Sequence, residues 1–283
     1  MRARAPASSA NLGPGFDVLA LALSLYVEVE IVPADRLTIS SEGEGSDIAC
    51  DGEHFAAQVA SAVIGHDHLA ISIRSQIPLK RGLGSSAALA VAVAAAAGAS
   101  DPFEVAAGYE GHLENAAASV QGGLVSAALV EGLPVLRSFP LDPGLAFVVL
   151  IPERELATSE ARNALANEVS RNDAVFNLSR MGLLLAGLAD RAMLVSQAGD
   201  DRLHQSKRAR LFPEAPELLS RLTKAGALVS CWSGAGPSLL GICDGAVAAA
   251  RVREAGEAAL SDLVVPGRAI VLEPDLVGLV VSD

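Results

Sequence analysis

The segment with the clearest chemical potential spans residues 77–98, which read IPLKRGLGSSAALAVAVAAAAG. Gly82 and Gly84 precede two serines, and a run of small apolar residues without a helix breaker follows. This order predicts a helix whose N-cap is Ser85 or Ser86, because serine oxygens satisfy free N–H groups of a first helical turn. A helix N-terminus that follows a glycine-rich loop attracts anions through those N–H groups and the helix dipole. The segment therefore predicts a cradle for a polyphosphate.

Three interpretations of this segment differ in the ligand that they imply. A Walker P-loop is excluded, because no glycine-lysine pair occurs anywhere in the chain. The loose dinucleotide pattern GxGxxA is matched, but the strand expected at residues 69–74 ends well before the first glycine, with Pro78 between them. A glycine turn before a buried helix, without any ligand, is the third interpretation. Lys80 and Arg81 favour phosphate binding, because they add positive charge just before the glycines.

The composition restricts the partners of the chain. It has 283 residues, of which 51% are hydrophobic and 4% aromatic, so we expect an aliphatic core in one large or two medium domains. The net charge of -12 argues against nucleic acid or an anionic membrane as a partner. No apolar run approaches the roughly 20 residues of a membrane-spanning helix. The three cysteines form no CxxC motif, which favours reduced thiols and a cytoplasmic protein.

Periodicity and turn residues predict two α/β halves that meet near residue 143. In the first half we expect strands at 2–7, 25–32, 36–41, 69–74, 124–130 and 134–136, and helices at 54–64, 85–97 and 103–110. The strand at 36–41 is expected to form a hairpin with 25–32. In the second half we expect strands at 145–152, 227–231, 239–243, 269–272 and 277–281, and helices at 159–166, 174–188, 216–225 and 246–260. Loops are expected at 8–17 and 203–213.

Three glycine-bearing segments together resemble the motifs of the GHMP kinase superfamily. They are PASSANLGPGFDVLALAL, IPLKRGLGSSAALAVA and SGAGPS, in this order along the chain. ANLGPGFD is similar to the form found in the homoserine kinase branch, and EGHLEN, AVFNLSR and DRLHQSKR extend the resemblance. It implies an α+β fold, with an N-terminal domain like ribosomal protein S5 (1–143) and a ferredoxin-like C-terminal domain (144–283). It also implies transfer of the ATP γ-phosphate to a small alcohol, with Mg²⁺ on the phosphates.

The resemblance further implies roles for particular residues. The triphosphate would contact Pro78, Lys80, Arg81, Gly82, Leu83, Gly84, Ser85, Ser86, Ala87 and Ala88. Ser86 and Glu110 would hold Mg²⁺ and, with Asp17, form the catalytic set. The substrate would be surrounded by Asn11, Asp17, Asn115, Arg180 and Arg208, and the motif Ser233, Gly234, Ala235 and Gly236 would lie near the site.

The chain departs from the family pattern in two of these motifs. In EGHLEN, this chain has Leu113 and Glu114 where the family usually has Pro and Asp. In DRLHQSKR, it has Ser206 and Lys207 where the family usually has Pro and Tyr. The second departure predicts a less stiff loop before Arg208, because this chain lacks the proline of the family pattern there. Two nearby histidines, His112 and His204, are expected to have structural roles.

The resemblance to the homoserine kinase branch implies that the small alcohol is L-homoserine. This amino acid is a zwitterion, so its binding site needs charged groups of both signs. Arg180 stands in a largely apolar helix and needs a partner, either an internal carboxylate or the carboxylate of the substrate. The resemblance favours the substrate. Asp17 is expected to orient the acceptor hydroxyl rather than remove its proton. Alternatives are another small-alcohol kinase of the superfamily, an inactive nucleotide-binding paralogue and an NAD-dependent oxidoreductase. A homodimer is a candidate assembly.

Overall fold

The computed structural model describes residues 1–111 and 113–282, so His112 and its expected role lie outside the described residues. The first sheet contains β1 (Arg2–Ala10), β2 (Leu19–Pro33), β3 (Thr38–Gly43), β4 (Leu69–Ser75), β5 (Leu124–Val130), β6 (Leu133–Phe139) and β11 (Val280–Ser282). The second contains β7 (Leu145–Pro152), β8 (Val229–Trp232), β9 (Leu239–Asp244) and β10 (Gly267–Leu272). The helices are α1 (Phe55–Ile64), α2 (Ser85–Ala96), α3 (Pro102–Glu110), α4 (Glu114–Gln121), α5 (Thr158–Asn163), α6 (Arg171–Ala189), α7 (Gln205–Arg208), α8 (Ala215–Lys224) and α9 (Gly245–Asp262), with 3-10 turns at Arg191–Met193 and Ser196–Gly199.

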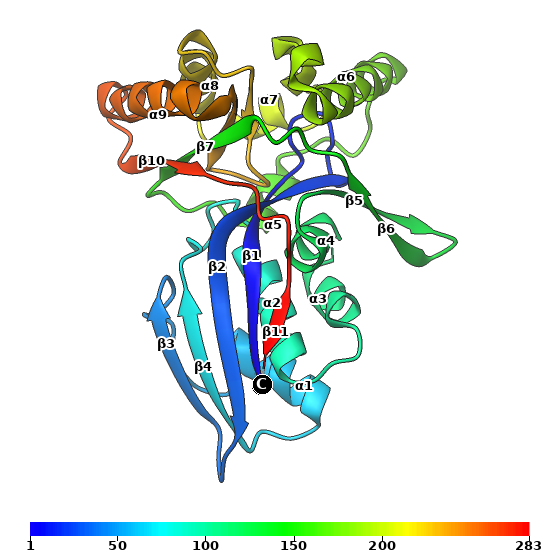
Figure 1. The fold of residues 1–283 in the computed structure, drawn as a ribbon, viewed down its shortest axis with the longest axis vertical. Coiled ribbons are helices and arrows are strands. Elements are labelled where there is room, and N and C mark those ends of the chain that lie inside the picture. The colour runs from blue at the N-terminus through cyan, green and yellow to red at the C-terminus, as the bar shows by residue number, and fades with distance from the viewer. Residues whose placement is uncertain (112, 283) are drawn as a thin grey trace.

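The first sheet has the order β11-β1-β2-β4-β3, and β5 and β6 extend it from β2. The predicted hairpin of residues 25–32 with 36–41 is wrong. β3 pairs in parallel with β4, with Ile39 opposite Ile71. The antiparallel partner of β2 on this side is β4, with Ile73 opposite Val29. Every second side chain of β4 is buried, so β4 belongs in the sheet interior and leaves β3 at the exposed edge. In Figure 1, β1 to β4 fill the lower part of the molecule.

Helix α2 is the central element behind this sheet. Its alanines and valines are buried on every side, because small side chains let the helix approach its neighbours closely. The helix begins as predicted at Ser85, but its N-cap is Gly84 rather than a serine. Gly84 has a left-handed backbone with φ of +65°, which turns the loop into the helix without a side-chain cap. The serine side chains are therefore free of the capping role.

The second sheet, of order β10-β7-β9-β8, is antiparallel throughout and joins two cores. β7 is buried along its whole length because its two faces pack against different layers. Val148 and Leu150 share a cluster with side chains of α8 and α9, whereas Phe147 and Val149 belong to the cluster that includes the first sheet and α2. Figure 1 shows α8 and α9 covering the outer face of this sheet.

The α+β class predicted from the sequence is confirmed, and the position of the domain boundary stays a proposal. The chain passes from the first sheet to the second between Phe139 and Leu145. β11 then returns to the first sheet, where Val281 lies opposite Ala3 on β1. A division into residues 1–143 and 144–283 thus assigns this last strand to the half with which it does not pair.

Two elements of the second half differ from expectation. The predicted loop 203–213 contains the short helix α7, and the helix expected at 159–166 is shorter and begins at Thr158. Both changes matter for the cavity described below, because each helix places an arginine beside it. Among residues 1–111 and 113–282, no helix combines the length and apolar character needed to cross a membrane.

Candidate active site

The three glycine-bearing segments meet in space and are joined by main-chain hydrogen bonds. The Ser8 N–H donates to the Leu83 carbonyl at 3.0 Å, which links the first segment to the second. The Gly234 N–H donates to the Ala10 carbonyl at 2.9 Å, which links the third segment to the first. Because these bonds connect residues far apart in the chain, the loops hold one another in place. The structure therefore assembles one site from the three motifs.

Two glycines permit this close approach. A Cβ added at Gly82 would lie 2.2 Å from the Ser233 carbonyl oxygen, and the Ser233 hydroxyl donates to the Gly82 carbonyl at 2.7 Å. A Cβ at Gly84 would lie 2.2 Å from the Ser8 hydroxyl oxygen, which itself donates to Asn115 Oδ1 at 2.9 Å. A side chain at either position would therefore push the segments apart.

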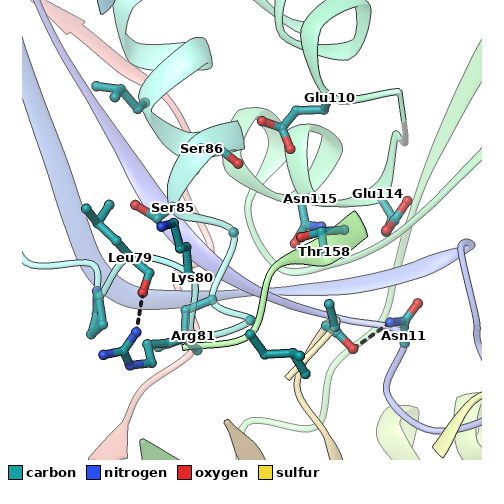
Figure 2. A pocket seen from close by; sticks show the side chains of 18 of the residues that line it. Asn11, Leu79, Lys80, Arg81, Ser85, Ser86, Glu110, Glu114, Asn115 and Thr158 are labelled. Carbon is teal, nitrogen blue, oxygen red and sulfur yellow. Dashed lines mark hydrogen bonds between the residues drawn. The ribbon is translucent and has the colours of Figure 1, made fainter. Parts of the chain in front are cut away.

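A cavity of about 290 Å³ lies where the segments meet. Of the predicted site residues, it is lined by Asn11, Asp17, Pro78, Lys80, Arg81, Gly82, Leu83, Gly84, Ser85, Ser86, Glu110, Asn115, Arg208, Gly234 and Ala235. It is also lined by Ile48, Phe55, Leu79, Leu89, Glu114, Leu156, Thr158 and Arg162. Figure 2 shows the N-terminal end of α2, with Ser85 and Ser86, facing this space. The predicted residues Ala87, Ala88, Arg180, Ser233 and Gly236 do not line it.

The two cations before the glycines have different surroundings. Lys80 is largely exposed, and its Nζ lies 3.1 Å from the carboxylate of Glu155. The Arg81 guanidinium is turned to main-chain carbonyls, donating to Pro152 at 2.9 Å and to Leu79 at 2.9 Å. Arg81 thus fixes the glycine loop to the second half of the chain. Its predicted contact with a phosphate is not favoured by this geometry, whereas Lys80 stays at the edge of the cavity.

Ser86 and Glu110, the predicted magnesium ligands, line the same cavity. In Figure 2 the Glu110 carboxylate points toward the N-terminal end of α2, where the Ser86 hydroxyl lies. A hydroxyl and a carboxylate at a phosphate site suit Mg²⁺, which takes oxygen ligands and keeps several waters. The donor set therefore fits this ion. Glu114, which replaces the usual aspartate, is buried and lines the cavity from the start of α4.

Asn11 is a connector within the site. Its backbone is left-handed, its Nδ2 donates to the Gly234 carbonyl at 2.8 Å, and its Oδ1 accepts from the Asp17 N–H at 2.9 Å. One amide thus joins the first and third glycine segments and shapes the turn that presents Asp17. This geometry supports a positioning role beside the predicted substrate contact.

Asp17 faces an arginine that the sequence analysis did not single out. Its two carboxylate oxygens accept from Arg162 Nη2 at 2.9 Å and from Nη1 at 3.0 Å. Both side chains are partly exposed and line the cavity. Arg162 reaches Asp17 from α5, whose first residue, Thr158, also lines the cavity. Nothing in the spacing of this segment shows that α5 would face the site, so only the short helical pattern could have drawn attention to it.

Arg208 is the second arginine of the cavity, and it is almost fully buried. Its Nη1 donates to the Gly234 carbonyl at 3.0 Å and to His204 Nδ1 at 3.1 Å. Burial lowers the pKa of Arg208 to about 10, partly offset by the charge of Asp17, so the guanidinium is still charged at neutral pH. The segment that was expected to be a less stiff loop contains α7, and Arg208 is the last residue of this short helix.

Arg180 lies outside the cavity. Its guanidinium stacks over the ring of Phe176 at 4.4 Å, and its Nε is 4.0 Å from an Asp200 carboxylate oxygen. Of the two partners weighed for this arginine, the structure provides the internal carboxylate. The preference for a substrate contact is not supported by its position.

A second, smaller cavity of about 70 Å³ adjoins the first and shares several lining residues with it. Its walls are mostly apolar and come from the first sheet, α1, α2 and the loop before Cys50: Val27, Gly45, Ile48, His54, Phe55, Ile73, Leu79 and Leu89 among them. This slot extends the main cavity with an apolar surface beside the phosphate loop.

Comparisons with known proteins agree with this arrangement. Sequence models of the GHMP kinase N-terminal domain and of the GHMP kinase C-terminal domain match residues 53–129 and 183–262. The homoserine kinase of Moorella thermoacetica is 38% identical over 258 residues, which cover 86% of this chain and 87% of that protein. The homoserine kinase of Desulfitobacterium hafniense is 34% identical and covers 99% of both chains. The crystal structure of homoserine kinase from Cytophaga hutchinsonii superposes with a TM-score of 0.87 at 25% identity, covering 100% of this chain and 97% of that one. The chain therefore belongs to the homoserine kinase branch of the GHMP kinase family.

Proposed function

We propose that the chain transfers the γ-phosphoryl group of ATP to the side-chain hydroxyl of L-homoserine, giving O-phospho-L-homoserine. The observation that carries this proposal is the ion pair between Asp17 and Arg162 in the same cavity as the N-terminus of α2. With Arg208 beside them, the carboxylate of Asp17 and the guanidinium groups of Arg162 and Arg208 form one charged group of side chains next to a phosphate-type loop. This charge set is complementary to a zwitterionic amino acid and not to an uncharged sugar.

The triphosphate would lie against the glycine loop and the first turn of α2. The N–H groups at the N-terminal end of α2 have no partner within the helix, and the helix dipole favours negative charge there. Gly82 and Gly84 let this loop pack closely against Ser233 and Ser8, because neither glycine carries a Cβ. The adenine ring would then enter the adjoining apolar slot beside Phe55 and Leu89.

Ser86 and Glu110 would hold Mg²⁺. When bound, the ion neutralises charge on the phosphate oxygens and so favours departure of the β-phosphate oxygen. The side chains contribute by binding and orientation. Glu110 extends from the end of α3 and Ser86 from the start of α2, so the pairing of these two helices sets the separation of the two ligands.

The ammonium and carboxylate groups of the substrate would displace the ion pair between Asp17 and Arg162. Its ammonium group replaces Arg162 as the partner of Asp17, and its carboxylate binds the released guanidinium together with Arg208. Each charge that is separated in this exchange gains a new partner, so no buried charge is left unpaired. Thr158, on the same helix as Arg162, also lines the cavity.

Deprotonation of the acceptor hydroxyl needs no dedicated strong base in this arrangement. In the proposed complex Asp17 pairs with the ammonium group of the substrate in place of Arg162, which suits an orienting role. Of the described residues, no histidine lines the main cavity. Phosphoryl transfer depends chiefly on alignment and charge stabilisation, so positioned cations and main-chain N–H groups can supply most of the rate enhancement.

One assay tests the function directly. ADP release with Mg-ATP is measured against L-homoserine, L-serine, mevalonate and galactose at equal concentration. We expect a clear preference for L-homoserine, with L-serine slower because its hydroxyl is one carbon closer to the charged groups. A preference for mevalonate or galactose would move the chain to another branch of small-alcohol kinases. Nucleotide binding without turnover on any acceptor would identify an inactive paralogue. A homodimer stays a prediction, which gel filtration with light scattering would test.

A further inference from the structure

His204 is a fully buried histidine that lies behind the cavity and does not line it. Its ring joins two parts of the site. Nε2 is 2.8 Å from the carbonyl oxygen of Gly13 in the first glycine segment, and Nδ1 is 3.1 Å from Nη1 of Arg208. The ring also stacks on Phe16, with centroids 5.2 Å apart. The histidine thus connects the loop that presents Asp17 to the arginine on α7.

These two partners determine the protonation state of the ring. A carbonyl oxygen can only accept, so Nε2 carries a hydrogen. A guanidinium can only donate, so Nδ1 presents its lone pair. The ring is therefore the neutral Nε2–H tautomer. Burial, with the nearby positive charge of Arg208, lowers the pKa of His204 to about 4 despite the opposing charge of Asp201.

Asp201 holds the turn on which His204 sits. Its buried carboxylate accepts from the N–H groups of His204 at 2.8 Å and Gln205 at 2.7 Å, and from Asn177 Nδ2 at 2.7 Å. These bonds fix the start of α7 against α6. The imidazole is consequently anchored through its main chain as well as through both ring nitrogens.

The anchoring restricts Arg208 in one particular way. Both hydrogens of Nη1 are engaged, one by His204 Nδ1 and one by the Gly234 carbonyl. Nε makes only a long contact of 3.5 Å to the Ala161 carbonyl. Within the described residues, Nη2 has no hydrogen-bond partner and is the end of the guanidinium left for a ligand. The plane of the group is therefore set by His204 and Gly234 before any ligand arrives.

We propose that His204 is a positioning residue that orients Arg208 for the carboxylate of the substrate. This inference rests on the proposed function, because the ligand it concerns is an amino acid. It assigns the acceptor atom Nδ1, rather than the bulk of the ring, as the feature that matters. A side chain that offers an acceptor at the position of Nδ1 should preserve the orientation of the Arg208 guanidinium. A side chain that keeps only the contact with the Gly13 carbonyl should not.

Two substitutions separate these contributions. In His204→Asn the side-chain oxygen can take the place of Nδ1, whereas in His204→Gln the side-chain amide can reach the place of Nε2. We expect the KM for L-homoserine to rise roughly 10-fold or more in His204→Gln, the size of effect that one hydrogen bond to a charged group supports. His204→Asn should raise it by no more than about 3-fold. The KM for Mg-ATP should change little in either variant.

A matched control measures the effect of lost stability alone. Tyr26→Phe removes a hydrogen bond of 2.9 Å from the Tyr26 hydroxyl to Asp275, and neither residue lines the cavity. It should lower the melting temperature and leave both KM values unchanged. If His204→Gln and His204→Asn raise the KM for L-homoserine equally, or raise both KM values in proportion to lost stability, the ring is only a packing residue and the proposal is wrong.

A substrate-independent measurement completes the test. Long-range ¹H–¹⁵N spectra of the wild-type protein at pH 7, with the His204→Gln variant for assignment, should show an unprotonated Nδ1 and a protonated Nε2. An Nδ1–H tautomer or an imidazolium would overturn the proposal. If the wild type does not phosphorylate L-homoserine, the proposed function fails, but the spectra still decide whether His204 accepts from Arg208.

Discussion

Replacing Arg162 by alanine should damage the use of L-homoserine far more than replacing Arg180. Arg162 lines the cavity and binds Asp17 through two hydrogen bonds of 2.9 and 3.0 Å. In the proposed complex the same group binds the substrate carboxylate. A hydrogen bond to a charged group contributes about 1.5–3 kcal/mol, so kcat/KM for L-homoserine should fall by roughly 10- to 150-fold.

The matched variant is Arg180→Ala, since this arginine stands on the neighbouring helix α6 and points elsewhere. Its ion pair with Asp200 is long, at 4.0 Å, and the Asp200 side chain is 54% exposed. The Arg180 side chain is only 26% exposed, but its partner lies largely in solvent, and ion pairs screened in this way contribute about 0–1 kcal/mol to stability. The kcat/KM for L-homoserine should therefore change by less than about 3-fold, and the free energy of unfolding should change only slightly.

The assay compares two acceptors on the wild type and both variants. One is L-homoserine and the other is 3-aminopropan-1-ol, which lacks the carboxylate but keeps the amine and the hydroxyl. Arg162→Ala should reduce phosphorylation of L-homoserine strongly and that of the amino alcohol much less. Equal losses on the two acceptors would mean that Arg162 acts only through Asp17. A larger loss in Arg180→Ala than in Arg162→Ala would refute the assignment made from the cavity.

Three further changes test other parts of the site. Glu110→Gln and Ser86→Ala should each lower kcat at saturating Mg-ATP much more than they lower the melting temperature, because both groups face charge in the transition state; near-normal kcat in Glu110→Gln would move the magnesium ligand elsewhere. Gly84→Ala should destabilise the protein and weaken Mg-ATP binding, because the new Cβ would lie 2.2 Å from the Ser8 hydroxyl oxygen at a residue with φ of +65°; unchanged calorimetric binding would contradict the close approach. The free energy of unfolding should fall as the pH drops from about 6.5 toward 4, because the pKa of His204 is lowered from 6.5 to about 4 in the folded chain and the unfolded chain takes up the proton first. The part of the free energy of unfolding that is lost in this way amounts to about 2–4 kcal/mol. Denaturant titrations of His204→Asn should lack it. If the free energy of unfolding of the variant falls with pH as steeply as that of the wild type, His204 is not the group responsible.

Local patterns were sufficient to predict much of the chain. The alternation of Val27, Glu28, Val29 and Glu30 predicts a half-exposed strand, because successive side chains of a strand point to opposite faces. The glycines and small apolar residues of 77–98 predict a phosphate loop followed by a buried helix, since both features depend on neighbouring residues. Each of the three glycine motifs is also a local pattern, and their order along the chain indicated the family.

What the tertiary structure decided were the contacts between segments far apart in the chain. Arg162 and Arg180 both stand on helices, and only the tertiary structure brings Arg162 to the cavity, where it binds Asp17 of the first glycine loop. β3 could pair with β2 or with β4, and the buried face of β4 selects the second arrangement. The tautomer of His204 depends on a carbonyl 191 residues earlier in the chain. The local sequence does not determine which distant group a side chain contacts, because such contacts depend on how whole helices and strands pack.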